Sequence, residues 1–404
     1  MKWEKVKLGD VCEITSSKRI FYSEYVDDGV PFYRSKEIIE SDEGKAIENP
    51  LYISVDKYNE IKEKFGVPQT GDMLLTAVGT IGIPYLIKKK DCFYFKDGNL
   101  TWFRDFREGL NSKYLYYWIK SSEGTGTLYN TTIGSSQKAL TISALKNIKV
   151  SLPPRSVQDK IVEVVSVYDD LIENNQKQIK LLEEAGQRLY KEWFVDLRFP
   201  GHENTKIVDG VPEGWNICPF SSKVDIMSGG TPKTSIPDYY NGRIPFYTPK
   251  DSDGAFFAYK TQMNITEGGL KNCNSRLYPP KTVIITARGT VGKTTILAVP
   301  MAMNQSCYAL KMKENDAPYY LFFALNNEIK ALQTMANGGV FNTIIGKTFD
   351  SINIQIPKDP LIYGFEETVR PFMEQIKNKL QANSKLVEAR NRLLLKMMNG
   401  EVEV

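Results

Sequence analysis

The stretch MLLTAVGTIG at residues 73–82 recurs as VIITARGTVG at residues 283–292. Three further pairs of segments match in the same order along the chain: WEKVKLGDVCEITS at 3–16 with WNICPFSSKVDIMS at 215–228, VPFYRSKE at 30–37 with IPFYTPKD at 244–251, and LKNIKVSLP at 145–153 with FDSINIQIP at 349–357. Repetition over a long period indicates an architecture built from copies of one unit. The sequence therefore predicts a duplicated chain.

Each copy combines short strands with helices and ends in a long helix. The apolar runs within a copy are short, rich in Thr, Val, Ile and aromatic residues, and separated by Gly and Pro, which is typical of strands joined by loops. A stretch without proline follows SLPPR at 151–155 and indicates the first long helix. The predicted fold is α+β, with two mixed α/β domains, each followed by a long helix. The predicted boundaries are 1–155 for the first domain, 156–198 for its helix, 199–358 for a linker and the second domain, and 359–404 for the second helix.

Apolar residues spaced alternately by three and four run along both predicted helices, as in a heptad seam. Asn175 and Gly186 interrupt the first seam, and the second is less regular. Helices of this length would be about 55 Å long and cannot bury their stripes within one small domain, so we expect the stripes to pack on each other. The alternative is that each helix folds back on its own domain. The seam residues are Val165, Tyr168, Ile172, Ile179, Leu182, Leu189 and Trp193 in the first helix, and Val369, Phe372, Ile376, Leu386 and Leu393 in the second.

Composition excludes several classes of function. The chain has 404 residues, five scattered cysteines that never form a CxxC pair, and a single histidine, His202. These features argue against a disulfide framework, a zinc site and most histidine-dependent catalysis. No run approaches the roughly 18 apolar residues of a membrane span, and the opening MKWEKVKLGD lacks the apolar core of a signal peptide. We therefore expect a cytoplasmic protein without a metal site or a membrane partner.

The segment ARGTVGKT at Ala287–Thr294 fits a relaxed phosphate-binding P-loop, in which Lys293 and Thr294 would serve phosphate and magnesium. The residues after it are strand-like and soon meet Pro300, whereas a P-loop must open a helix. The first copy also has Ile83 and Pro84 in place of Lys293 and Thr294. A P-loop NTPase therefore stays an alternative, and the sequence shows no other catalytic constellation. We expect a binding protein and not an enzyme.

Positive charge favours the two domains over the helices as the place where a polyanion binds. Lys and Arg outnumber Asp and Glu in 1–155 and in 199–358, but not in the helical segments. Loops at equivalent places in the two copies carry side chains that can donate to phosphates and base edges. The candidate DNA-binding residues are Lys18, Arg19, Arg34, Lys36, Thr76, Thr80, Ser135, Gln137 and Lys138 in the first copy, and Thr231, Lys233, Lys250, Thr286, Arg288, Thr290, Lys293 and Asn342 in the second. The positions that differ, Arg34 against Thr248 and Val78 against Arg288, are predicted to read sequence.

The ordered set of these motifs resembles the specificity subunit of type I restriction–modification systems, over essentially the whole chain. The resemblance lies in WEKVKLGDVCEI at 3–14 and its echo PEGWNICPF at 212–220, in SGGTP at 228–232, in the two Gly-Thr-x-Gly turns and in KEWFVDLRFPG at 191–201. It implies two mixed α/β target recognition domains that each read half of a bipartite sequence in double-stranded DNA. It also implies that two long antiparallel coiled-coil helices separate these domains.

The resemblance also implies partners for the two long helices. Two methyltransferase subunits would bind around these helices, and restriction subunits would join the assembly. No cofactor is then expected in this chain, because S-adenosylmethionine, ATP and magnesium would belong to those partners. The remaining alternative is a coiled-coil scaffold without a role on DNA.

Overall fold

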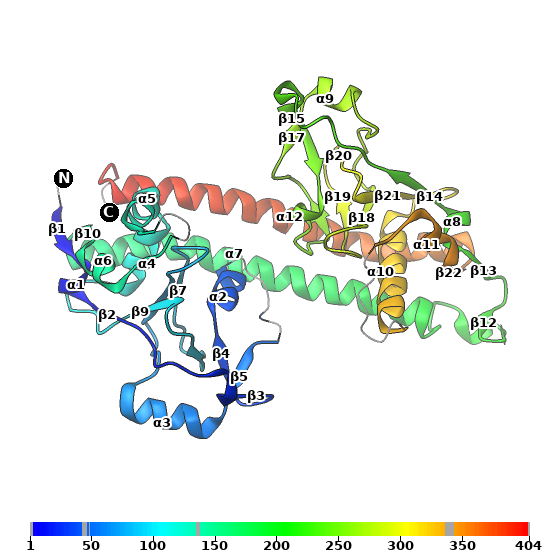
Figure 1. Cartoon of the computed structure of the whole chain (residues 1–404). Helices are drawn as coiled ribbons and strands as arrows, with labels where there is room; N and C mark the ends of the chain where they lie inside the picture. The colour runs from blue at the N-terminus through cyan, green and yellow to red at the C-terminus, as the bar shows by residue number, and fades with distance from the viewer. Residues whose placement is uncertain (1–2, 43–46, 48, 135–137, 336–342, 403–404) are drawn as a thin grey trace. The chain divides into compact units, whose positions relative to one another are not determined.

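The structure is a computed structural model that describes the chain except for residues 1–2, 43–46, 48, 135–137, 336–342 and 403–404. The chain forms two compact units (Figure 1). Unit 1 comprises Met1–Glu173 and Lys385–Val404, and unit 2 comprises Asn174–Ser384. Each unit thus combines one globular domain with a part of both long helices. Among the described residues, no helix is long and apolar enough to cross a bilayer.

Unit 1 contains a short framing ladder and two four-stranded sheets. The ladder pairs β1 (Glu4–Lys7) with β10 (Lys149–Leu152), and at its end the Leu8 amide donates to the Ile148 carbonyl over 2.9 Å. The first sheet has the order β2 (Glu13–Thr15), β9 (Leu100–Arg104), β6 (Met73–Thr76), β7 (Pro84–Leu86), and the second has the order β3 (Tyr25–Val26), β5 (Leu51–Ile53), β4 (Val30–Tyr33), β8 (Tyr94–Phe95). The helices are α1 (Leu8–Val11), α2 (Ser35–Asp42), α3 (Val55–Phe65), α4 (Ser112–Lys120), α5 (Ser122–Thr131) and α6 (Ile142–Asn147), with a 3₁₀ turn at Tyr22–Glu24.

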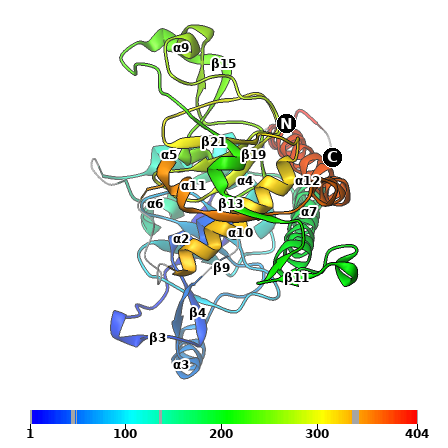
Figure 2. The same ribbon diagram turned by 90° about the vertical axis from the view of Figure 1, so that its right-hand side faces the viewer.

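Unit 2 repeats this plan. Its ladder pairs β13 (Asn216–Pro219) with β22 (Asn353–Ile356), and the Phe220 amide donates to the Ile352 carbonyl over 2.8 Å. The larger sheet has the order β14 (Val224–Ser228), β21 (Cys307–Met312), β18 (Val283–Thr286), β19 (Thr294–Leu297), β16 (Phe257–Ala258), and the smaller has β17 (Asn264–Ile265), β15 (Tyr240–Tyr247), β20 (Ala302–Met303). A hairpin of β11 (Ile207–Val208) and β12 (Val211–Pro212) precedes them. The helices are α8 (Phe220–Lys223), α9 (Glu267–Lys271), α10 (Pro318–Met335) and α11 (Gly346–Ser351), with 3₁₀ turns at His202–Asn204, Pro237–Tyr239 and Pro249–Asp251; α10 and α11 face the viewer in Figure 2.

The two units share their strand order and an equivalent parallel pairing, which confirms the predicted duplication. The order β2-β9-β6-β7 in unit 1 corresponds to β14-β21-β18-β19 in unit 2. In the second sheet of each unit, one pair of strands runs parallel: β4 with β8, and β15 with β20. Because these pairs hold the PFY segment of each copy, the equivalence fixes where the following loops emerge.

The two long helices are α7 (Arg155–Tyr190), which continues as a π-helical turn at Lys191–Val195, and α12 (Asp359–Met398). They run antiparallel within each unit. In unit 1, Asp169 of α7 contacts Arg390 of α12 over 2.6 Å, while the earlier Ile161 shares a core with the later Met397. In unit 2, the rings of Trp193 and Phe365 lie 5.9 Å apart. The predicted mutual packing is therefore confirmed within each unit.

Burial along the predicted seam is uneven. Val165, Ile179, Val369 and Ile376 are buried, and the other predicted seam residues are partly buried: Tyr168, Ile172, Leu182, Leu189, Trp193, Phe372, Leu386 and Leu393. Met373, which the prediction did not name, is also buried and fits the same spacing, four residues after Val369 and three before Ile376. Asn175 does not simply weaken the seam, because its side-chain amide donates to Asn383 over 2.8 Å. Polar residues at such positions are stabilised when they bond each other.

Gly186 interrupts the apolar seam because the ring of Phe323 occupies the space of a side chain. A Cβ atom at this position would lie 2.7 Å from Cζ of Phe323. That ring is itself buried, and its centroid lies 5.9 Å from the centroid of the Phe365 ring and 6.2 Å from that of the Tyr190 ring. The glycine therefore lets α10 approach α7 closely within unit 2.

We expect Gly186→Ala to lower the free energy of unfolding by up to about 2 kcal/mol, because the crowded Phe323 ring must shift within a filled core at a cost of about 1–3 kcal/mol. This cost outweighs the gain of about 1 kcal/mol that alanine brings to a helix. Thermal and denaturant unfolding of the full chain measure it. Gly126→Ala in α5 is the matched control, since nothing lies within 4 Å of its Cβ position. The control should be stabilised, and equal effects of both variants would contradict the account of Gly186.

Candidate nucleic-acid interface

In both units the Gly-Thr-x-Gly segment forms the turn between two antiparallel strands, β6 and β7 or β18 and β19. The backbone φ angles are +80° and +85° at Gly79 and Gly82, and +85° and +83° at Gly289 and Gly292. L-residues with a side chain rarely adopt this left-handed region. The glycines that the copies share are therefore required by the turn.

Thr76 and Thr286 stabilise the same turn from its buried side. Both are completely buried, and their hydroxyl oxygens accept the amides of Ile83 over 2.9 Å and Lys293 over 3.1 Å. A buried hydroxyl needs such partners, and here they lie within the turn. Their burial corrects the prediction that these two threonines contact DNA.

The same region excludes the P-loop alternative. Residues 294–297 form β19, which pairs with β18 and β16, where a P-loop would open a helix. Thr294 is buried, and its hydroxyl donates to Oδ1 of Asn326 over 2.7 Å. Thr294 is thus not placed to hold magnesium, and the P-loop reading of Ala287–Thr294 is wrong.

Arg34 is held by the buried carboxylate of Glu37. The Arg34 side chain donates to Glu37 over 2.6 and 3.3 Å, and its amide donates over 2.7 Å. Although burial works in the opposite direction, these hydrogen bonds hold the pKa of Glu37 below its ordinary value. In unit 2, the Thr248 hydroxyl and amide each donate to Asp251 over 2.8 Å. The Arg34–Thr248 difference, predicted to read sequence, therefore changes the donor in one local hydrogen-bonded turn.

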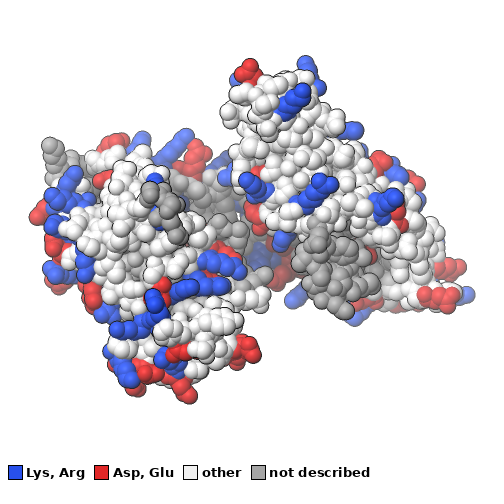
Figure 3. Space-filling view, in the orientation of Figure 1, with Lys and Arg blue, Asp and Glu red and all other residues white. Residues whose placement is uncertain are grey.

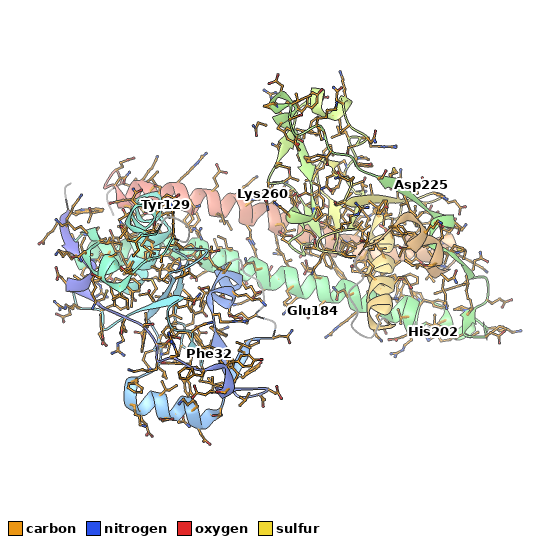
Figure 4. All side chains as sticks on the ribbon, viewed as in Figure 1. Phe32, Tyr129, Glu184, His202, Asp225 and Lys260 are labelled. Carbon is orange, nitrogen blue, oxygen red and sulfur yellow. The ribbon has the colours of Figure 1, made fainter. Side chains whose placement is uncertain are left out.

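The other candidate cations of unit 1 also have partners. Arg19 pairs with Asp97 over 2.9 Å, and Lys36 with Glu40 over 3.5 Å. The remaining two ammonium groups lie over aromatic rings: Lys18 is 4.3 Å from the centroid of Phe65, and Lys138 is 3.6 Å from that of Tyr129. Figure 4 labels Tyr129. Such contacts orient a cation before a ligand arrives, and the acidic partners also weaken its field.

The candidate cations of unit 2 differ from those of unit 1 in their lack of acidic partners in the part of the chain that the structure describes. Lys233, Lys250, Arg288 and Lys293 are exposed, and within the described residues their side chains make no ion pair or hydrogen bond. Over the middle of the visible face of unit 2, basic side chains stand among uncharged ones and acidic side chains lie toward the edges, whereas acidic and basic side chains alternate over much of unit 1 (Figure 3). The candidate cations of the two units therefore differ in their partners although the units share a fold.

Backbone contacts bring the candidate loops of unit 1 together. The Asn99 carbonyl accepts the Ser35 hydroxyl over 3.4 Å and the Ala77 amide over 2.8 Å. The Leu140 amide donates to the Ala77 carbonyl over 2.9 Å. The PFY loop, the Gly-Thr-x-Gly turn and the segment before α6 thus form one surface, which exposes Lys36, Thr80 and Lys138.

The equivalent loops of unit 2 meet in the same way. The Thr290 hydroxyl donates to the Pro249 carbonyl over 3.3 Å, and the Ala287 amide donates to the Ser306 carbonyl over 2.7 Å. The Ile344 amide donates to the Ala287 carbonyl over 2.9 Å. We call these equivalent surfaces the loop surface of unit 1 (residues 34–36, 77–82 and 138–140) and the loop surface of unit 2 (residues 248–250, 287–293 and 344).

Two exposed residues beside these surfaces were missed by the sequence analysis. The Thr231 hydroxyl donates to Gln305, which precedes Ser306 and is exposed. The duplication leads to the residue beside Gln305, because Asn99 and Ser306 accept the equivalent amides of Ala77 and Ala287. Tyr129 has a 63% exposed side chain on α5 and lies in none of the matched segments of the repeat, so the repeat gives no signal for it. The predicted Ser135, Gln137 and Asn342 lie outside the described residues.

Comparisons with known proteins agree with this duplicated arrangement. The sequence model of the family described as "Type I restriction modification DNA specificity domain" matches residues 1–184 and 212–381. The MjaIX specificity subunit of a type I restriction enzyme from Methanocaldococcus jannaschii is 27% identical, over 100% of this chain and 94% of the relative. The HindI specificity subunit of a type I restriction enzyme from Haemophilus influenzae is 24% identical, over 65% of this chain and 71% of the relative.

A solved structure has the same fold. The crystal structure of the S subunit of a type I restriction–modification system from M. genitalium aligns with 98% of this chain and 96% of that chain, with a TM-score of 0.56 and 16% sequence identity. At this identity the likeness concerns the fold. It supports the predicted class of mixed α/β domains with long antiparallel helices.

Proposed function

This chain belongs to the family of type I restriction–modification DNA specificity subunits, and from that premise we propose that units 1 and 2 each read one half of a bipartite, asymmetric sequence in double-stranded DNA. The family's subunits recognise DNA and do not catalyse its modification. The observation that carries the proposal is the pair of equivalent loop surfaces, which expose different side chains on one frame. Base edges would decide the sequence, while phosphates would supply most of the affinity.

The helices α7 and α12 would dock two methyltransferase subunits, and restriction subunits would join the complex. Exposed apolar side chains on α7 support this part of the proposal: Val167 is 53% exposed and Leu171 is 46% exposed in unit 1. Apolar residues on an exposed helix face are a common feature of interaction sites. S-adenosylmethionine, ATP and magnesium would then be bound by those partner subunits. The alternative function is a coiled-coil scaffold without DNA affinity, and the following test distinguishes it from a DNA-reading subunit.

The unpaired cations of unit 2 should contribute more to DNA affinity than the paired cations of unit 1. The test compares two sets of alanine substitutions in the full chain assembled with its methyltransferase subunits. The set in unit 2 is Lys233, Lys250, Arg288 and Lys293, and the matched set in unit 1 is Lys18, Arg19, Lys36 and Lys138. Each phosphate contact adds about 0.9 to the slope of log affinity against log salt concentration. We expect the first set to lower the slope by about 3 and the second by less than half as much.

Arg34 is left unchanged in this comparison because its removal would strand the buried Glu37. DNA affinity is measured at several salt concentrations on a methylation substrate and on random duplex. An unchanged slope in both sets would contradict DNA binding through the loop surfaces. A larger change from the unit 1 set would contradict the difference between the two sets of cations in their partners.

A further inference from the structure

Position 288 in unit 2 and position 78 in unit 1 are structurally equivalent but hold opposite kinds of side chain. Both residues directly precede the first positive-φ glycine of the same turn. Val78 is half-buried and forms a β-bridge with Ala139. Arg288 is exposed, and its guanidinium makes no ion pair or hydrogen bond within the described residues. One frame thus presents an apolar side chain in one unit and an uncompensated guanidinium in the other.

The backbone that carries Arg288 is held on both sides. The Ala287 amide donates to Ser306 over 2.7 Å, and its carbonyl accepts the Ile344 amide over 2.9 Å. On the other side, the Thr290 hydroxyl donates to the Pro249 carbonyl. A side chain mounted on such a fixed turn loses less freedom when it binds a ligand. The position of the Arg288 backbone is therefore fixed, while its guanidinium keeps all of its donors free of bonds to the described residues and available for a ligand.

A guanidinium fork matches two neighbouring acceptors, and DNA offers these in two places. They are O6 and N7 on the major-groove edge of guanine, or two oxygens of a phosphate. Lys250 and Lys293 on the same loop surface are flexible, exposed ammonium groups that suit phosphates as point charges. Arg288, in contrast, lies at a position where the two units differ. Two unlike half-sites can be distinguished only by residues that differ between the two units. These observations favour a contact between Arg288 and the edge of a base over a contact with a phosphate.

We infer that Arg288 reads a guanine in the half-site bound by unit 2, through paired hydrogen bonds to O6 and N7. The inference rests on the proposed function and adds to it the identity of one base. Val78 has no donor to offer, so unit 1 does not read a guanine from the equivalent position.

The test maps methylated sites in cells that carry the full chain, its Arg288→Ala and Arg288→Lys variants, and the methyltransferase subunits. The half-site of unit 2 is first identified by exchanging unit 2's domain. Arg288→Ala should lose discrimination at one G·C pair of that half-site by roughly 5- to 150-fold, with every other position unchanged. Arg288→Lys should lose part of it, because lysine keeps the charge but not the fork.

Lys250→Ala serves as the comparison for a phosphate contact and should weaken methylation equally at all sites. A uniform loss in Arg288→Ala with an unchanged motif would assign Arg288 to a phosphate and overturn the inference. Relaxation at an A·T pair would overturn it as well. The proposed function is tested separately by the domain exchange. If that exchange alters both half-sites, the units do not each read one half-site, and this result does not depend on the role of Arg288.

Discussion

Exchange of residues 8–148 for the corresponding domain of a relative is expected to change one half of the methylated sequence and leave the other half unaltered. The cut points follow from the fold, because the Leu8–Ile148 hydrogen bond closes the ladder of β1 and β10 at the base of the domain. Methylation of the original site should fall by about 10³-fold or more, which is the usual margin between specific and non-specific binding. Methylation-site mapping of cells that carry the chimaera and the methyltransferase subunits measures both effects.

The matched exchange replaces residues 220–352, which the Phe220–Ile352 hydrogen bond delimits in the same way. It should change the opposite half of the sequence. A chimaera that folds and methylates DNA, but whose two half-sites both differ from the original, would rule out independent readers. The donor domain should keep a tyrosine equivalent to Tyr117, whose hydroxyl donates to Asp169 of α7 over 2.6 Å and joins the domain to its helix.

Four residues added to both helices should lengthen the gap between the half-sites by one or two base pairs. The insertion points are after Glu173 in α7 and after Ser384 in α12, where one unit gives way to the other. Four helical residues add about 6 Å of length and turn the chain by about 40° beyond one full turn. A length of about 6 Å corresponds to about two base pairs, because each base pair adds roughly 3.4 Å. A rotation of about 40° corresponds to one base pair, because the duplex has about 10 base pairs per turn.

Contacts within each unit survive this double insertion, because Asp169–Arg390 lies in unit 1 and Asn175–Asn383 lies in unit 2. The half-site sequences should therefore stay as they were. Four residues added to α7 alone are the control, since they displace α7 against α12 and should reduce stability and methylation. An unaltered gap in an active double-insertion protein would count against the helices as the spacer.

The sequence predicts the frame of this molecule well for a physical reason. A duplication exposes the residues that the backbone requires, such as Gly79 and Gly289, whose positive φ angles few other residues tolerate. The periodicity of apolar residues likewise predicts two long helices with a buried stripe, which packs both on the other helix and on the core of the domain in each unit. These are local or repeated signals, and a single sequence contains them.

Contacts between distant segments could not be predicted in this way. Gly186 looks like a defect in the seam until the ring of Phe323 is placed against it. Arg34 looks like a free DNA ligand until Glu37 is found buried beneath it, and Thr286 looks exposed because a turn motif does not tell which of its side chains point inward. In each case the deciding fact is the identity of the neighbour in space, which spacing along the chain does not contain.

One chain thus carries two different readers on one repeated frame. Methylation-site mapping in cells that carry the unaltered chain with its methyltransferase subunits decides whether both readers act. We expect one motif with two unlike halves, separated by a fixed number of base pairs at which any base is accepted. An uninterrupted motif, or one whose halves are identical, would contradict it.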